Sequence, residues 1–394
     1  MNDIIIIGSG PSSLLTLLYL VIHIPYLKYT IISYNFKEFH CTYGVFLDQI
    51  KDSWIFKYLD KDKLFSNIYD IVVKTPLKIE TKKKYGIIDN EYFYNAILKI
   101  VGSKATFSEK KVDNISKISN TYFVKCEDKT TFTSRFVFEG TGKYGAIGVK
   151  YNNSPLYKQY FLGYMIKLDK PCNLDTNECI LLDWENSYES NIKSFGYIIP
   201  YNKKKILFEE TVLNCPNNTQ PNYEILRAKL KNRLDMYNIK DYTIEFIEKD
   251  SIPLNMGIPC EKTSYSFGIG QCGNIINTLS GYTIGYNIQV IPEICNLVFK
   301  HNYNLEKVYL DFWTFKRRFI YNINLIGLKL MNTLPEKELC NFHHYYFKYI
   351  INSSNFNIMF LNNNNYSAFR LIFSFRHYLY FPKKYLWNIG QRLF

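Results

Sequence analysis

The stretch Asp3–Leu15 constrains the fold of this chain more than any other. Four consecutive isoleucines, Ile4–Ile7, precede the turn Gly8-Ser9-Gly10-Pro11-Ser12-Ser13, and the apolar residues of Leu14–Leu20 follow with helical spacing. Such an isoleucine run predicts a strand buried on both faces, as in a parallel sheet. A strand, a glycine turn and a helix in this order bring backbone N–H groups and the helix dipole to one place, where a pyrophosphate can bind. We therefore predict a dinucleotide site for FAD or NAD, with an ordinary strand-turn-helix connection as the alternative.

Two serines depart from the usual pattern of such a site. Ser13 stands at the third glycine position of G-x-G-x-x-G, so we expect the helix to pack slightly further from the strand. The second predicted strand, Tyr29–Ser33, ends in Ser33, where an acidic residue commonly binds the ribose hydroxyls. A serine hydroxyl can still hydrogen-bond ribose, although without the charge-assisted part of the contact. The predicted nucleotide contacts are Gly8, Ser9, Gly10, Pro11, Ser12, Ser13 and Ser33.

Charge and cysteine content exclude several classes of function. The net charge is +13, but the lysines are scattered and no nucleic-acid recognition motif accompanies them. A solvated basic surface is favoured over attraction to an anionic membrane, and we expect no nucleic-acid partner. The nine cysteines occur singly, without metal-type pairing with the six histidines, so we expect no metal site and a reducing compartment.

We expect neither a signal peptide nor a membrane-spanning helix from this sequence. Asp3 precedes the first apolar run and the glycine turn interrupts it, which is unlike a signal peptide. An uninterrupted apolar run of about 18 residues, as needed to span a bilayer, is absent. The expected location is cytoplasmic or organellar, with at most a peripheral membrane contact.

Changes of pattern along the 394 residues predict more than one domain. Phe136–Gly142 is a second buried strand that runs into a glycine turn, so the nucleotide domain resumes there. Longer alternating strands occupy 159–246, glycine-rich connections return at 251–285, and the remainder is mainly helical and aromatic. We predict an α/β (α+β) fold: a Rossmann-like FAD-binding domain of 1–150 and 251–300, an inserted mixed β-sheet substrate domain of 151–250, and a helical C-terminal region of 301–394.

Two short acidic stretches are candidates for catalysis. In Leu207–Thr211, strand alternation places Glu209 and Glu210 on opposite faces, so at most one should enter an apolar interior. A carboxyl group buried there has a raised pKa and can act as a general acid near neutral pH. A strand end with two solvated acids is the alternative. Asp183 can likewise be a buried catalytic acid. The alternative is a turn in which Trp184 packs against the protein.

Two further aspartates and a histidine pair have simpler explanations. Asp48 and Asp89 each end a run that begins with Tyr-Gly, and helix capping explains both. We expect His343-His344 to lie on a helix face and not around a metal.

Taken in order, the motifs resemble the lycopene cyclases of carotenoid synthesis, a flavoprotein family related to the aromatic-hydroxylase-type FAD enzymes. The most specific match is Phe195–Thr211, which resembles an aromatic-proline strand followed by the family signature F-L-E-E-T. The other matching stretches are the Gly-Ser-Gly-Pro turn, Tyr43–Asp48, Tyr85–Asp89, Phe138–Gly142, Gln159–Gly163, Leu181–Trp184, Ile252–Pro259, Gly268–Gly270, Gly281-Tyr282, Trp313, Lys316–Phe319 and Phe342–Phe347.

The resemblance implies a reaction and a set of site residues. Family members bind FAD and close the linear end groups of lycopene into rings without net oxidation. The flavin acts in its reduced form, and NAD(P)H is the expected indirect electron source. The implied acid is Glu209, with Glu210 as an accessory or structural partner and Asp183 as a weaker candidate for shaping the pocket. Further cofactor contacts implied by the matching stretches are Asp48, Gly140, Gly142, Gly268, Gly270, Gly281 and Tyr282.

Other functions remain open on the sequence. A flavin monooxygenase or a reductase of a prenyl chain is the main alternative enzyme. A protein of another class would keep the flavoprotein fold but only escort a lipid or a prenylated protein. Bound flavin in the purified protein separates the escort from the enzymes. The implied partners are lycopene or a related linear carotenoid and a membrane surface.

Overall fold

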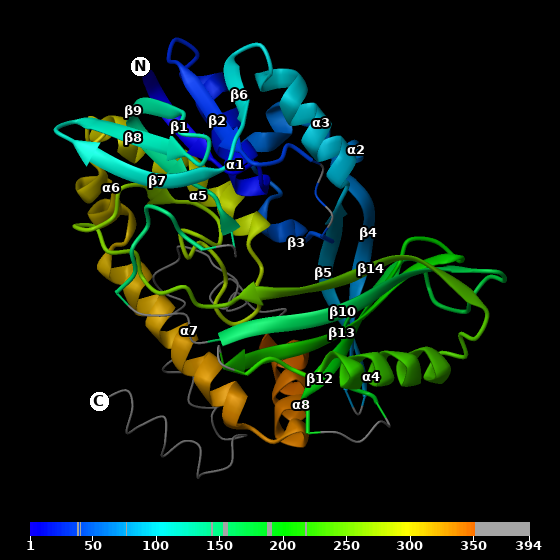
Figure 1. The fold of residues 1–394 in the computed structure, drawn as a ribbon. Helices are drawn as coiled ribbons and strands as arrows, with labels where there is room; N and C mark the ends of the chain where they lie inside the picture. The colour runs from blue at the N-terminus through cyan, green and yellow to red at the C-terminus, as the bar shows by residue number, and fades with distance from the viewer. Residues whose placement is uncertain are drawn as a thin grey trace.

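The computed structural model describes residues 1–37, 39, 41–75, 77–142, 145–152, 157–186, 191–216 and 219–350. The described chain forms two sheets, and Figure 1 shows the first of them, in blue and cyan, above the green strands of the second. The helical region predicted for 301–394 is helical as far as residue 350, and the rest of that prediction lies outside the described residues.

The first sheet has the strand order β6-β2-β1-β9-β8-β7, with β15 paired to β9. The central strand β1 pairs in parallel with β2 and β9, and its residues Ile4–Ile7 are buried, as the isoleucine run predicts. The strand bounds are β1 (Asn2–Ile7), β2 (Tyr29–Ser33), β6 (Ala105–Glu109), β7 (Val112–Ile118), β8 (Thr121–Cys126), β9 (Thr131–Glu139) and β15 (Phe267–Gly268).

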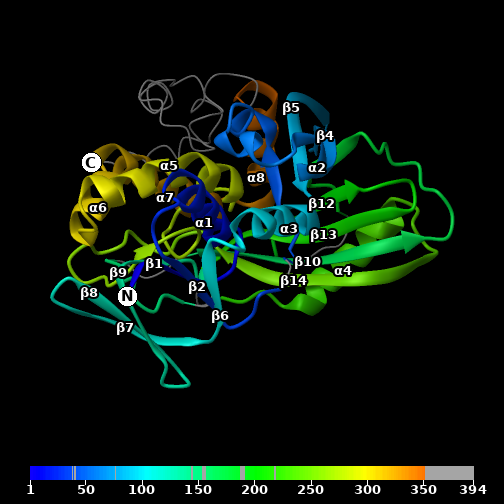
Figure 2. The same ribbon diagram turned by 90° about the horizontal axis from the view of Figure 1, so that it is seen from above.

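Helices cover the first sheet. α1 contacts both α3 and α5, and Figure 2 shows it between these two helices. Asp89 caps α3 by accepting a hydrogen bond from the backbone N–H of Tyr92 at 2.8 Å, which confirms its predicted capping role. The bounds are α1 (Pro11–His23), α2 (Lys61–Leu64), α3 (Asn90–Val101), α5 (Ile284–Lys300) and α6 (Leu305–Phe312).

The second sheet has the strand order β14-β10-β13-β12-β11-β4-β5-β3. Its pairs are antiparallel except β11–β4. The bounds are β3 (Gly44–Phe46), β4 (Phe65–Lys74), β5 (Lys78–Ile88), β10 (Tyr157–Leu168), β11 (Glu178–Asp183), β12 (Ser194–Pro200), β13 (Lys205–Pro216) and β14 (Tyr242–Pro253). Strands β3, β4 and β5 therefore belong to this sheet, although their residues fall within the range 1–150 predicted for the nucleotide domain.

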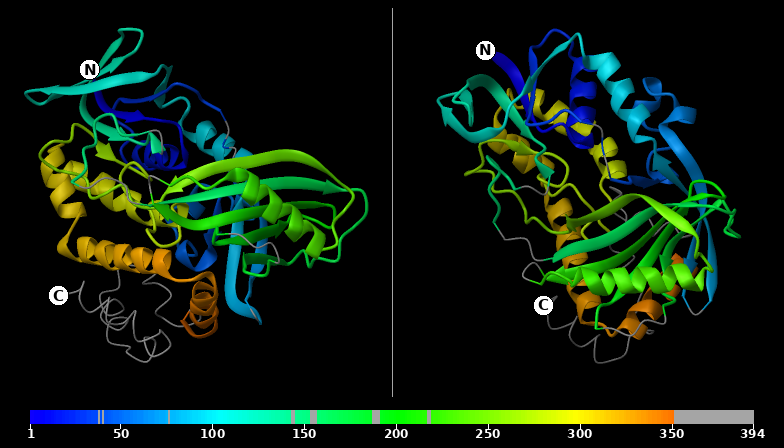
Figure 3. Two further views of the ribbon diagram at one scale, coloured as in Figure 1. Left: turned by 60° about the horizontal axis from the view of Figure 1, so that its bottom comes forward. Right: turned by 45° about the vertical axis from the view of Figure 1, so that its right-hand side comes forward.

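Both faces of the second sheet are covered. α4 (Tyr223–Met236) lies along one face, where Leu230 packs with Phe208, as Figure 3 shows for the helix. On the other face, Leu207 and Leu213 share a core with residues of α7 (Phe315–Thr333) and α8 (Glu336–Tyr345). A π-helical turn, Tyr346–Ile350, follows α8. None of the helices in the described part of the chain is long and apolar enough to cross a membrane.

Candidate active site

Two glycines shape the turn between β1 and α1: Gly8 allows a close backbone approach, and Gly10 leaves the helix N-terminus uncovered. Gly8 has φ +93°, and a Cβ there would lie 2.5 Å from the carbonyl oxygen of Gly140, so only glycine fits. Gly10 is the N-cap of α1, where no side chain caps the helix, and a Cβ on it would meet nothing within 4 Å. The N-terminus of α1 is thus free to bind an anion through its backbone N–H groups.

The side chain of Ser13 fits beneath this turn because Gly140 lies opposite it. A Cβ on Gly140 would overlap Ser13 Oγ, so the glycine of the second strand-turn unit makes room for the serine that replaces a glycine in the first. Ser13 Oγ is itself buried and makes no hydrogen bond. The uncapped N-terminus of α1, above this packed serine, fits the phosphate groups of a dinucleotide.

Ser33 lies at the end of β2, beside the same turn. Its Oγ donates to the carbonyl oxygen of Asn35 at 2.8 Å and lies 3.0 Å from Ser9 Oγ. Both serines line the cavity described next, as the nucleotide prediction requires.

One cavity of about 990 Å³ joins the glycine turn to the second sheet. Most of the predicted site residues line it: Gly8, Ser9, Gly10, Pro11, Ser12, Ser13, Ser33, Gly140, Gly142, Glu209, Gly270, Gly281 and Tyr282. Gly270 has φ +61°, and a Cβ there would lie 2.6 Å from Ser12 Oγ, so its loop packs directly on the start of α1. The predicted residues Asp48, Asp183, Glu210 and Gly268 are not among those that line this cavity.

Glu209 is the buried acid of the cavity. Its carboxyl group accepts a hydrogen bond from Thr211 Oγ1, and the residue is 9% exposed. Burial first, and the nearby charge of Glu248 second, raise the pKa of Glu209 to about 8. A carboxyl group with this pKa holds its proton at neutral pH, which a general acid requires.

Glu210 lies on the opposite face of β13 and has an ionic partner. Arg233 of α4 donates from Nε to Glu210 Oε2 at 2.9 Å, and Ser194 Oγ donates to Glu210 Oε1 at 2.6 Å. The alternation predicted for the two glutamates is therefore confirmed, but both are buried, because α4 covers the face that the sequence leaves undefined. Glu210 is held as an ion pair away from the cavity.

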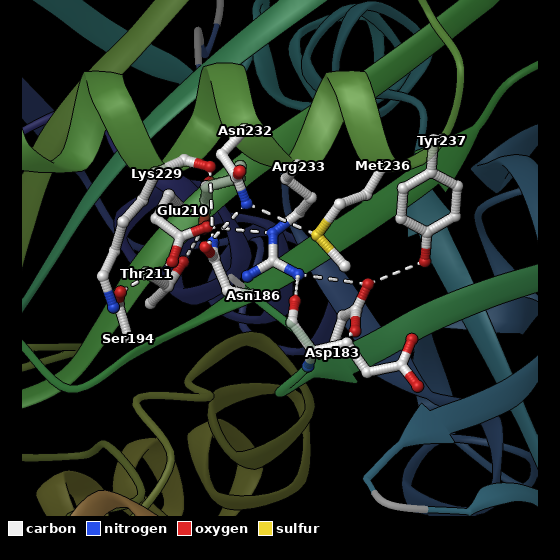
Figure 4. Close-up of polar contacts among 12 residues, drawn as sticks. Asp183, Asn186, Ser194, Glu210, Thr211, Lys229, Asn232, Arg233, Met236 and Tyr237 are labelled. Atoms are coloured by element: carbon white, nitrogen blue, oxygen red, sulfur yellow. Dashed lines mark hydrogen bonds and ion pairs between the residues drawn. The ribbon is translucent and has the colours of Figure 1, made fainter. Parts of the chain in front are cut away.

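Asp183 belongs to the same cluster as Glu210. Its Oδ2 lies 3.1 Å from Arg233 Nη1 and accepts a hydrogen bond from the hydroxyl of Tyr237 at 2.7 Å. Figure 4 shows the guanidinium between the two carboxylates, with Tyr237 on the far side of Asp183. Both acids that the sequence places beside Glu209 in catalysis thus form a buried ion-pair cluster under α4.

The contacts of Asp48 and Gly268 are structural and lie outside the cavity lining. Asp48 lies in a short 3₁₀ turn, Leu47–Gln49, and forms an ion pair with Lys83, with its side chain 47% exposed. Gly268 is in β15, where a Cβ would lie 2.6 Å from the Cα of Gly273. Close backbone packing, and not a cofactor contact, accounts for this glycine.

Three tyrosines form a chain of hydroxyl groups next to the acid. Tyr197 donates to Tyr85 at 3.1 Å, and Tyr85 donates to Tyr282 at 3.2 Å. Tyr197 of β12 is paired with Glu209 of β13 in the sheet register, and all three rings line the cavity. Burial raises the pKa of each of the three well above 10, so these phenols stay neutral.

A second acid, Glu248 of β14, also lines the cavity and was not a candidate from the sequence. It is 5% exposed and accepts hydrogen bonds from the backbone N–H of Thr42 at 2.7 Å and from Thr42 Oγ1 at 3.1 Å. No local signal marks this residue, because its position depends on the pairing of β14 with β10.

The histidine pair lies on α8, as predicted, and His343 lines the cavity. Its Nδ1 donates to the carbonyl oxygen of Leu339 at 2.8 Å, and its ring packs against Trp184 with centroids 5.2 Å apart. Burial lowers the pKa of His343 to about 4, so the ring is neutral. Among the described residues, no group of three or more His, Cys, Asp and Glu side chains is placed to hold a metal ion.

Comparison with solved structures identifies proteins of the same fold. A geranylgeranyl bacteriochlorophyll reductase-like protein from Thermoplasma acidophilum aligns over 91% of this chain and 94% of its own, with a TM-score of 0.69 and 11% identity. A variant of the halogenase PltM, solved in complex with FAD, aligns over 88% of this chain and 77% of its own, with a TM-score of 0.54 and 11% identity. The predicted fold class, a Rossmann-like FAD-binding architecture with a mixed sheet and a helical region, is confirmed.

Comparison of sequences gives the family. The chain is 22% identical over 299 residues to the chloroplastic lycopene beta cyclase of Solanum lycopersicum, an alignment that covers 70% of this chain and 58% of that protein. It thus spans little more than half the length of this curated relative. The family model described as lycopene cyclase protein matches residues 3–350. Nearly the whole described chain is matched, and the protein belongs to the lycopene cyclase family.

Proposed function

We propose that this protein binds FAD and closes the linear end groups of lycopene, or of a related linear carotenoid, into β-ionone rings without net oxidation. The product of two closures is β-carotene, formed through γ-carotene, and the reaction is that of an intramolecular lyase or isomerase. One observation carries the proposal: a buried carboxyl group with a raised pKa, Glu209, lies in the same cavity as the glycine turn.

Glu209 is the acid in this proposal. Its carboxyl proton is transferred to the terminal double bond of the substrate, which leaves a carbocation. The neighbouring double bond attacks the cation and closes the six-membered ring. A water molecule then takes a proton from an adjacent carbon, which forms the ring alkene. Protons gained and lost are equal, so each closure is an isomerisation.

The aromatic lining of the cavity suits a cationic intermediate. Tyr197, Tyr85 and Tyr282 present neutral rings beside Glu209, and aromatic faces attract a positive charge. Their buried hydroxyl groups are bonded to one another, which leaves the ring faces as the surface offered to a hydrocarbon.

The glycine turn is the proposed FAD site. Gly8, Gly10 and the N-terminus of α1 would hold the pyrophosphate, and Ser33 would contact the ribose. Reduced FAD supplies negative charge in a dry cavity, which stabilises the developing cation. The proposed source of its electrons is NAD(P)H, acting indirectly.

The substrate sets the location of the protein. A long hydrocarbon is dissolved in a bilayer, so we propose that the protein works in the cytoplasm or an organelle with peripheral contact to a membrane surface. The net charge of +13 supports attraction to anionic lipid.

Expression in bacteria that accumulate lycopene tests the proposal, with the pigments separated by chromatography and flavin measured in the purified protein. We expect γ-carotene and β-carotene, and yellow protein that retains FAD. Unchanged lycopene beside soluble, flavin-bound protein contradicts the cyclase. Products richer in hydrogen identify a reductase, oxygenated products identify a monooxygenase, and protein that takes up no FAD identifies the escort.

A further inference from the structure

Glu209 and Glu248 lie in one row of the second sheet, on either side of a glycine. The register pairs Gly163 of β10 with Glu209 of β13 and with Glu248 of β14. Residues directly opposite each other in antiparallel strands point to the same face. A Cβ on Gly163 would lie 3.3 Å from the Cβ of Glu209, so the glycine leaves the space between the two carboxyl groups free of side chains.

Glu248 also borders a second cavity, of about 260 Å³. Part of the lining of this second cavity is polar, with Thr42, Ser66, Asp89, Asn90 and Tyr201. Glu248 lines both cavities, whereas Glu209 lines only the main one. Glu248 is therefore the carboxyl group that connects the polar second cavity with the acid.

The proposed reaction creates a need for such a connection, and the inference rests on that proposed function. Glu209 gives up its proton at each ring closure and must regain one before the next. A hydrocarbon that fills the main cavity separates Glu209 from the water that accepts the proton lost from carbon. The replacement proton has to arrive from another direction.

We propose that Glu248 is a positioning residue that passes protons from the second cavity to Glu209. The Glu248 carboxylate takes a proton from a hydronium ion in the second cavity, which leaves water. The new O–H bond of Glu248 then breaks as its proton moves to the Glu209 carboxylate through the space beside Gly163, and Glu248 is again a carboxylate. No electrons are exchanged, and the proton taken up in the second cavity equals the proton that ring closure releases from carbon to water.

The electrostatics support transfer in this direction. Burial raises the pKa of Glu248, while hydrogen bonds from Thr42 lower it, so the group is able to gain and lose a proton. Burial and the charge of Glu248 raise the pKa of Glu209. The other titratable groups with a recorded electrostatic interaction with this pair, within the described part of the chain, are acids or phenols: Glu210, Asp250, Tyr43, Tyr197, Tyr201 and Tyr282.

Infrared difference spectra across a pH titration test the coupling without turnover. The band that disappears in Glu209→Gln identifies the Glu209 carboxyl, and its midpoint in wild type is the reference. In Glu248→Gln we expect this midpoint to fall by at least half a pH unit, because a charge that raises it is removed. In Thr42→Val, which keeps the Glu248 side chain and removes one hydrogen bond that favours its charge, we expect a smaller fall. An exposed residue of the same strand gives the matched control, Glu245→Gln, in which the midpoint stays unchanged.

Single-turnover and multiple-turnover kinetics test the transfer itself. At a pH at least one unit below the Glu209 midpoints of both proteins, the first ring closure in Glu248→Gln should keep its wild-type rate, because Glu209 starts protonated, while later closures slow by at least tenfold. Glu248→Asp should restore part of the later rate. An unshifted Glu209 midpoint in both Glu248→Gln and Thr42→Val, or an equal loss of first and later closures, overturns the proposal. If wild type closes no rings, the cyclase proposal fails separately, and the infrared midpoint still decides whether Glu248 acts on Glu209.

Discussion

Glu209 and Glu210 are adjacent on β13, but Glu209 faces the cavity and Glu210 faces α4, where it pairs with Arg233. One carboxyl group is kept protonated by burial. The other forms an ion pair with a guanidinium 2.9 Å away. The two halves of the F-L-E-E-T signature therefore have different tasks in our account. The first supplies acid chemistry and the second holds the strand that carries it.

The pH dependence of ring closure should follow Glu209. Its pKa is raised to about 8, so the acid form is present at neutral pH and is lost as the pH rises through that value. We expect the rate under saturating lycopene and reduced FAD to fall about tenfold for each pH unit above about 8. In Glu209→Gln the activity should be absent at every pH, with FAD still bound. A rate that rises between pH 7 and 9 would remove Glu209 from the role of acid.

The buried ion-pair cluster should matter for stability and not for chemistry. Arg233→Met leaves Asp183 and Glu210 buried without their cation, which should lower the free energy of unfolding by about 3–5 kcal/mol. The matched control on α4 is Arg227→Met, whose exposed pair with Glu224 at 3.7 Å should be worth less than about 1 kcal/mol. Urea unfolding measures both.

Glu210→Gln separates the two roles within the signature. We expect a loss of stability together with a nearly unchanged rate per folded, FAD-loaded molecule. A rate as low as that of Glu209→Gln, in protein that is folded and loaded, would place Glu210 in the chemistry after all.

The two glycines of the opening turn should respond differently to alanine. Gly8→Ala forces a side chain into a left-handed conformation and against a carbonyl oxygen, so the apoprotein should lose at least about 1–3 kcal/mol of stability. Gly10→Ala meets no protein atom, so the apoprotein should lose at most about 1 kcal/mol, as an N-cap change does. Its methyl group instead fills the open N-terminus of α1, and FAD affinity should fall at least tenfold. Flavin fluorescence titration measures this, and wild-type affinity in Gly10→Ala would refute the proposed pyrophosphate site.

His343 should make the protein less stable in mild acid. Its folded-state pKa is lowered to about 4 from 6.5, so between these values the unfolded chain binds a proton that the folded chain does not. Stability is therefore lost as the pH falls from 6.5 towards 4, by roughly 1.4 kcal/mol for each pH unit. His343→Phe keeps a ring against Trp184 and removes the titration. Its unfolding free energy should depend less on pH in this window, and an unchanged slope would contradict the assignment.

The predictions that the structure confirms came from patterns among neighbouring residues. The Ile4–Ile7 run gave a buried parallel strand, and alternation placed Glu209 and Glu210 on opposite faces, because both depend only on neighbouring residues. The match of motifs in order gave the family, although each motif alone is short.

Long-range pairing accounts for what the sequence left out. The pairing of β4 with β11 takes strands from the first hundred residues into the second sheet, and nothing in their own sequence indicates this partner. Glu248 faces the cavity through the register of β14, and Asp183 meets Arg233 only because α4 folds back over the sheet.

Asn277 has a structural role that its own sequence does not indicate. Its Oδ1 accepts hydrogen bonds from the backbone N–H groups of Leu279 and Ser280, each at 2.9 Å. The carbonyl oxygen of Asn277 accepts a further bond from Gly281 at 2.8 Å. The asparagine thus forms the turn that presents Gly281 and Tyr282 to the cavity.

The central claim is that ring closure begins with a proton from a solvent-exchangeable acid and involves no net redox change. Purified protein with reduced FAD, given lycopene in lipid vesicles in D₂O, tests it by mass spectrometry of the carotenoid product. The account predicts one non-exchangeable deuterium for each ring closed, a product with the mass of lycopene when the same reaction runs in H₂O, and no product with Glu209→Gln. A cyclic product without deuterium, or one that differs from lycopene in hydrogen or oxygen content, would contradict it.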